Sequence, residues 1–96
     1  MSENNMNEYF QNDSFDFKTN KEIIKTVALR VKKIRKVNFK TQALFAKHIG
    51  MSHGSYGRFE TTGEVSFSGF ISILKGIGYI DKLDELLNQD DDLIKW

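Results

Sequence analysis

Apolar residues in the first half of the chain recur at helical spacing from residue 20 to residue 37. Thr19 precedes this stretch, and Glu22 three positions later completes the spacing of a capping box. Lysines and Leu29 fall on the opposite side, where Leu29 does not fit the pattern. The spacing predicts an amphipathic helix whose inward stripe is Ile23, Ile24, Val27, Ala28, Val31 and Ile34.

Four shorter helices follow, most of them introduced by a capping residue. Thr41 caps a predicted helix over 42–49 that Gly50 ends, and Ser52 caps one that ends near residue 60. The two are close enough in sequence to form a tight helix-turn-helix. Ser66 caps a helix over 67–75, and a last helix covers 81–88. The apolar faces are Leu44, Phe45, Ala46 and Ile49, then Tyr56 and Phe59, then Phe70, Ile71 and Leu74, then Leu83, Leu86 and Leu87. No strand pattern is present, so the expected fold class is all-α.

The chain length of 96 residues allows one small domain. We expect that domain over 19–88, preceded by a flexible N-terminal arm over 1–18 and followed by an acidic, apolar C-terminal tail over 89–96. The chain has no Cys, which excludes disulfides and thiolate zinc sites and is consistent with a reducing compartment. No apolar run is long enough for a spanning helix, and the acidic start is unlike a signal peptide. We therefore expect a cytoplasmic protein that does not bind membranes.

Charge is segregated along the chain although the net charge is only +1. Residues 21–60 carry ten bases and two acids, whereas residues 1–20 have a net charge of −3 and residues 80–96 one of −4. A basic body between acidic ends favours a polyanion-binding surface. The alternative is a solvated helix face that happens to be rich in lysine.

The outward face of the helix after Ser52 presents His53, Gly54, Gly57 and Arg58 and carries no carboxylate of its own. Such a face fits a DNA major groove, which is about 12 Å wide. Arg58 has the donors for a bidentate contact with guanine, and His53 can donate to a base or a phosphate. The two glycines permit close approach of the backbone to DNA. Alternatively, they only make the helix short and weak.

Arg35 falls within the apolar stripe of the first helix, and a buried guanidinium needs a partner. Glu60 is the acid in the middle of the chain that can turn inward, so we predict an Arg35–Glu60 ion pair. The alternative is that Arg35 buries its stem and extends its charge to solvent.

These residues, taken in order, resemble the lambda-repressor-like, or Xre-type, helix-turn-helix family. The resemblance spans residues 30–87 and is carried by Arg35, Thr41-Gln42, Ala46, Gly50-Met51-Ser52, Phe59-Glu60 and Gly63. Within the family, residues 54–66 look most like the HipB-like regulators, many of them antitoxins encoded beside a HipA-type kinase toxin. The resemblance implies a five-helix domain that binds a palindromic operator as a homodimer through its third helix.

The resemblance also implies roles for single residues. His53, Gly54, Gly57 and Arg58 take the base-reading positions, and Arg35 with Glu60 matches the family's buried ion pair. The phosphate-contacting positions are Lys40, Thr41, Gln42, Ser55 and Thr62. Because two base-reading positions are glycine, DNA shape and phosphate contacts carry more of the specificity than in other members.

We therefore expect a sequence-specific regulator of transcription that binds double-stranded DNA, most simply a repressor, with an antitoxin role also implied. Such a protein is associated with the nucleoid when bound to DNA. The alternative is a protein-interaction module that mainly neutralises a partner toxin such as a HipA-type kinase. No catalytic arrangement, metal-ligand set or cofactor fingerprint is present in the sequence, so we do not expect an enzyme.

The tail combines three acids with Leu93, Ile94 and Trp96 near the chain end. Trp is enriched at binding hot spots, so these residues are predicted to bind a partner protein. The alternatives are that the tail folds back onto the domain or packs within a homodimer.

Overall fold

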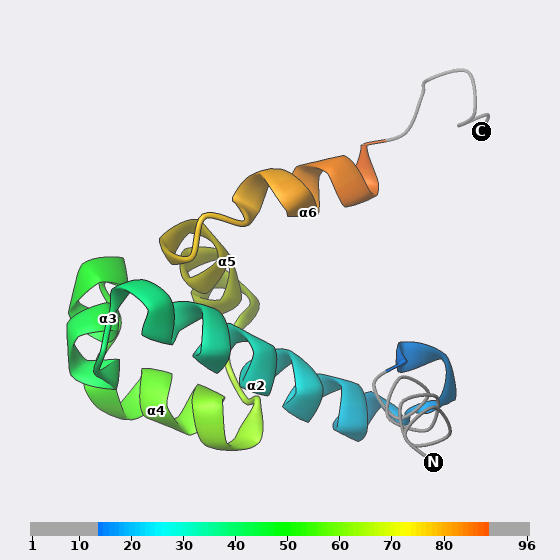
Figure 1. The fold of residues 1–96 in the computed structure, drawn as a ribbon, viewed down its shortest axis with the longest axis horizontal. Coiled ribbons are helices and arrows are strands. Elements are labelled where there is room, and N and C mark those ends of the chain that lie inside the picture. The colour runs from blue at the N-terminus through cyan, green and yellow to red at the C-terminus, as the bar shows by residue number, and fades with distance from the viewer. Residues whose placement is uncertain (1–13, 89–96) are drawn as a thin grey trace, which may run out of the picture.

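The computed structural model describes residues 14–88, and this part of the chain consists of helices joined by turns and loops, with no strand (Figure 1). The elements are the 3₁₀ helix η1 (Phe15–Phe17) and the α-helices α2 (Asn20–Asn38), α3 (Gln42–Ile49), α4 (His53–Thr62), α5 (Phe67–Gly76) and α6 (Ile80–Leu87). The expected all-α class is confirmed. The helix bounds differ from those expected by at most two residues.

Side-chain caps define where four of the described α-helices begin. Thr19 Oγ1 accepts from the Glu22 N–H at 3.2 Å, and a Glu22 carboxylate oxygen accepts from the Thr19 N–H at 2.9 Å, which completes the capping box of α2. Thr41, Ser52 and Ser66 each accept from the N–H three residues later. The hydrogen bonds that define these helix starts are therefore local and involve no tertiary contact.

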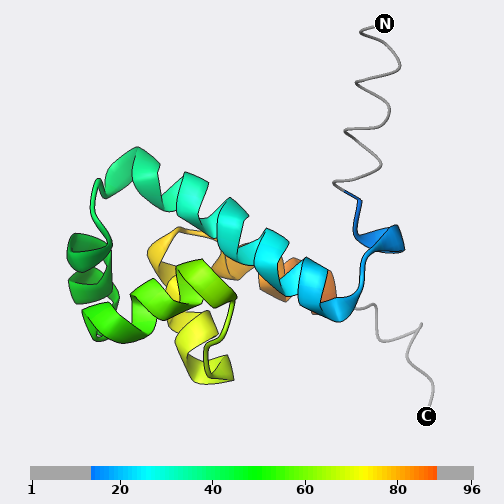
Figure 2. The ribbon, with the colours of Figure 1, turned by 90° about the horizontal axis from the view of Figure 1, so that it is seen from below.

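The core lies where α2, α3, α4 and α5 meet (Figures 1 and 2). Helix α2 crosses α4, and α3 lies at the C-terminal end of α2. Its buried apolar residues are Ala28, Val31, Phe45, Ala46, Tyr56, Phe59 and Ile73. The ring of Phe45 lies edge-on to Tyr56 at 5.0 Å and to Phe39 at 5.3 Å between centroids. These T-shaped contacts are a favoured aromatic geometry, and they join α3 to α4 and to the loop after α2.

Several residues expected to face inward do not. Leu44 is 56% exposed and Ile24 is 46% exposed. Ile73 is the fully buried residue of α5, whereas the residues expected there, Phe70 among them, are only half-buried. For Leu44 the physical reason is that α3 is short and is buried along a narrow strip that contains Phe45 and Ala46. Leu44 lies one position before Phe45 and is therefore rotated by about 100° toward solvent.

Helix α6 packs against α5 and extends away from the α2–α4 body (Figure 1). None of its residues is buried, and Leu86 and Leu87 are 69% and 68% exposed. Its apolar face is thus not covered by the described residues, in contrast to the faces of α2 and α4. None of the helices in the described part of the chain is both long and apolar enough to cross a membrane.

Part of the expected N-terminal arm has a defined structure. Residues Phe15–Phe17 form η1, and the guanidinium of Arg30 lies over the Phe15 ring at 4.8 Å from its centroid. This cation–π contact docks the arm on α2. Residues 1–13 of the arm and the tail residues Leu93, Ile94 and Trp96 lie outside the described residues.

Candidate nucleic-acid interface

A tight turn joins α3 to α4. Gly50 ends α3 with a φ of 76°, and the Met51 N–H donates to the carbonyl of Ala46 at 2.9 Å. This is the hydrogen-bond pattern of a Schellman motif, which favours glycine because only glycine adopts positive φ without strain. Ser52 then starts α4 immediately. The turn fixes the direction of α4 relative to α3.

The ion pair expected between α2 and α4 is present and buried. Arg35 Nε and Nη2 donate to the two carboxylate oxygens of Glu60, both at 3.0 Å. Arg35 Nη1 donates to the carbonyls of Phe39 and Lys40 at 2.9 and 3.0 Å. The side chains of Arg35 and Glu60 are 3% and 2% exposed, so the charged groups are satisfied by each other and by the chain after α2.

Two further side chains donate to Glu60 and extend the network to α3. Gln42 Nε2 donates at 2.8 Å, and Tyr56 Oη donates at 2.5 Å. Burial alone would raise the pKa of Glu60, but the hydrogen bonds from Arg35, Tyr56 and Gln42 outweigh it, and the pKa lies below its usual value. The hydrogen bond to Glu60 raises the pKa of Arg35, whereas burial and the bond to Glu60 raise that of Tyr56. The network therefore ties α2, α3 and α4 together through one carboxylate.

Gly57 does not belong to the outward face of α4, contrary to the expectation from the sequence. It is half-buried, and a Cβ added there would lie 3.0 Å from Gln42 Oε1. The glycine lets α3 and α4 approach closely enough for Gln42 to reach Glu60. Gly54, in contrast, is exposed and meets nothing within 4 Å. The face that remains consists of His53, Gly54, Ser55 and Arg58, all exposed.

The residues expected to contact phosphates occupy both ends of the helix pair. Lys40 and Thr41 are exposed ahead of α3, and Ser55 is exposed in the first turn of α4. Gln42 is half-buried, and its amide donates to Glu60. The Thr62 hydroxyl donates to the carbonyl of Arg58 and accepts from the N–H of Glu64. Lys40 and Ser55 therefore have side chains that reach solvent, whereas Gln42 and Thr62 also hold the fold together.

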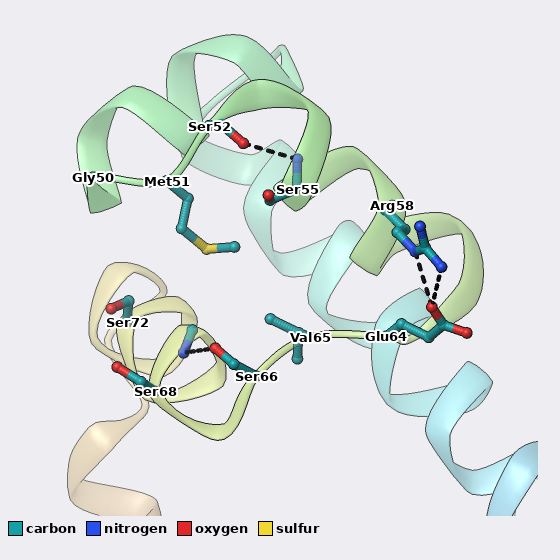
Figure 3. A pocket seen from close by; sticks show the side chains of 11 residues that line it. Gly50, Met51, Ser52, Ser55, Arg58, Glu64, Val65, Ser66, Ser68 and Ser72 are labelled. Atoms are coloured by element: carbon teal, nitrogen blue, oxygen red, sulfur yellow. Dashed lines mark hydrogen bonds and ion pairs between the residues drawn. The ribbon is translucent and has the colours of Figure 1, made fainter.

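A carboxylate reaches the α4 face after all, and it belongs to Glu64 in the loop after α4. Arg58 Nε and Nη2 donate to Glu64 Oε1 at 2.9 and 2.6 Å (Figure 3). Both side chains are mostly exposed, at 68% and 62%. The expectation that this face lacks an acid holds for α4 itself but not for the folded surface, because the loop returns along the helix.

Arg58 and Glu64 stand at one end of an open groove of about 620 Å³ between α4 and α5 (Figure 3). Its lining includes the serines Ser52, Ser55, Ser66, Ser68 and Ser72. Ser52 and Ser66 are the N-caps of α4 and α5, so the N-termini of both helices border this groove. Hydroxyl donors and helix N-termini are compatible with an anionic ligand, whereas the charge of Glu64 opposes one.

Helical periodicity could not reveal Glu64 or the serines of α5 as part of this surface. The serines of α5 reach this surface only because α5 packs beside α4. Glu64 lies beyond the end of α4, so helical spacing cannot relate it to Arg58. Among residues 14–88, no group of three or more His, Asp or Glu side chains is arranged to hold a metal ion.

Comparison of the chain with protein-family models, with curated proteins and with solved structures finds no match.

Proposed function

We propose that this protein is a non-enzymatic, sequence-specific regulator that binds double-stranded DNA through α4. The observation that carries the proposal is the exposed face of α4. His53, Gly54 and Arg58 lie together on it, and the network around Glu60 holds the helix rigidly against α2 and α3. A rigid helix with small and basic outward residues fits a major groove.

The charge distribution supports the same proposal. Residues 21–60 contain only two acids, Glu22 and Glu60. Glu60 is neutralised by Arg35, and Glu22 caps the first turn of α2. With the buried pair set aside, nine bases and one acid remain in this segment. Such an excess attracts a polyanion and makes its binding depend strongly on salt.

The order of the five α-helices and the tight α3–α4 turn agree with the lambda-repressor-like resemblance described above. We extend the proposal accordingly to a homodimer that acts on a palindromic operator, most simply as a repressor. The HipB-like character of residues 54–66 adds an antitoxin role beside a kinase-type toxin to what we propose.

The test starts from genomic fragments retained by the immobilised protein, with the preferred duplex identified by sequencing. Affinity for that duplex and for a scrambled duplex is then measured at several salt concentrations. We expect a steep loss of affinity with salt and a clear preference for the selected sequence. Absence of duplex retention even at low salt would refute the proposal.

Two substitutions test how base and phosphate contacts are divided. Arg58→Ala is expected to cost about 1–3 kcal/mol on the preferred duplex and to relax preference at one G·C pair. Lys40→Ala is expected to weaken binding to all duplexes evenly and to lower the salt slope by about 1. Lys82→Ala, an exposed base on α6, is the control. Equal losses for Arg58→Ala on preferred and scrambled DNA would make Arg58 a phosphate contact.

The exposed apolar face of α6 favours a second candidate, a protein-interaction module that neutralises a partner. Leu86 and Leu87 are exposed there, on a helix away from the α4 face (Figure 1). Apolar side chains gathered on one exposed face are typical of a surface that another protein covers. A purified protein that retains no duplex DNA but co-purifies with a second protein would favour this candidate.

A further inference from the structure

The fold itself supplies an anionic partner for Arg58. We infer that Glu64 competes with DNA for the guanidinium of Arg58 and thereby limits the affinity of the α4 face for its duplex. The inference rests on the proposed function, because it concerns the same surface and names the residue that opposes binding there.

The hydrogen bonds of the pair engage two donors of the Arg58 guanidinium. Arg58 presents Nε and Nη2 to one oxygen of Glu64, at 2.9 and 2.6 Å. A fork of guanidinium donors is also what arginine offers to guanine O6 and N7 or to a phosphate. Glu64 therefore occupies, in the unbound protein, donors that a DNA contact requires.

The backbone of the turn after α4 places Glu64 beside Arg58. The Thr62 hydroxyl donates to the carbonyl of Arg58 at 2.8 Å and accepts from the N–H of Glu64 at 3.0 Å. One side chain thus links the backbones of the two partners. Gly63 between them has a φ of 83°, and its N–H donates to the carbonyl of Phe59 at 2.7 Å.

Packing on α2 holds this turn in place. A Cβ added to Gly63 would lie 2.1 Å from Ile24 Cγ2 and 3.1 Å from the carbonyl oxygen of Ile24. The turn therefore lies directly against the first turns of α2. The backbone of Glu64 is therefore held beside Arg58 by a turn that packs against α2.

Binding of DNA then carries two costs at this position. The pair must open, and an exposed ion pair changes an equilibrium constant by up to about fivefold. The released carboxylate also stays near the approaching phosphates, which repel it over roughly a Debye length of about 8–10 Å. Both costs disappear when Glu64 loses its charge, but only the first depends on Arg58.

The experiment is a double-mutant cycle on the full-length chain. Affinity for the selected duplex is measured for the wild type, Glu64→Gln, Arg58→Ala and the double variant. Glu85→Gln is the control, since Glu85 is an exposed acid on α6 and the change in charge is the same. Thermal melting of each variant verifies that the fold is intact.

We expect Glu64→Gln to tighten binding by about three- to tenfold and Glu85→Gln to change it by less than about twofold. In the Arg58→Ala background the gain from Glu64→Gln should shrink to about twofold or less, since no pair remains to be opened. In the unbound wild type, the Arg58 Nε–H proton should exchange with water more slowly in NMR spectra than in Glu64→Gln.

The outcomes separate the two proposals. If the wild type retains no duplex at low salt, the proposed function fails, and this inference with it. If the wild type binds but Glu64→Gln gains no more than Glu85→Gln, only the inference fails. An equal gain with and without Arg58, or equal Nε–H exchange rates, also overturns it, because Glu64 would then act by charge alone.

Discussion

Replacing Glu60 by alanine should destabilise the domain severely, because four hydrogen bonds converge on this carboxylate. Two come from Arg35, one from Gln42 and one from Tyr56. After the substitution, Arg35 keeps only the carbonyls of Phe39 and Lys40 as acceptors. Its side chain is 3% exposed, so water cannot readily replace the lost anion.

The expected cost is about 3–5 kcal/mol, the usual consequence of leaving a buried charge without its partner. Small domains are stable by only about 5–15 kcal/mol, so this loss is a large fraction of the total. For a domain of this size it corresponds to a fall in Tm of more than about 12 °C. Urea unfolding followed by circular dichroism measures the loss directly.

Two further variants isolate the cause. Glu64→Ala removes an exposed ion pair and is expected to cost no more than about 1 kcal/mol. Arg35→Met, which removes the buried charge, should cost less in the Glu60→Ala background than in the wild type. An unchanged urea midpoint in Glu60→Ala, or an equal cost of Arg35→Met in both backgrounds, would refute the reasoning.

Three other predictions concern stability. Folding lowers the pKa of Glu60 below its ordinary value of 4.5. The stability that the Glu60 carboxylate contributes is therefore complete above pH 4.5 and is lost as the pH falls below that value. The urea midpoint of the wild type should accordingly drop more steeply below pH 4.5 than that of Glu60→Gln. Gly63→Ala should cost clearly more than Gly50→Ala in thermal melting. Both glycines have positive φ, but only at Gly63 would the added Cβ collide with a neighbour, Ile24. Equal losses of stability in the two variants would contradict this prediction. Ile73→Ala should cost about 2–5 kcal/mol and Leu86→Ser less than about 0.5 kcal/mol in urea unfolding. A large loss for Leu86→Ser would show that α6 is covered in solution.

The sequence by itself determined the helices and their starting points. Thr19, Thr41, Ser52 and Ser66 cap helices within a few residues of themselves, and such local hydrogen bonds need no tertiary structure. The sequence also predicted the pairing of Arg35 with Glu60. A guanidinium in an apolar stripe needs a carboxylate, and residues 21–60 contain only one besides the capping Glu22.

Only the tertiary structure decided what surrounds these residues. Gly57 turned out to face Gln42, and Arg58 acquired Glu64 as a partner across a helix end. Leu44 faces solvent because a short helix is buried along one narrow strip. Periodicity specifies which residues share a side of a helix, but the neighbour that covers that side depends on how the helices pack. The composition of the α4 surface is therefore a property of the fold and not of α4 alone.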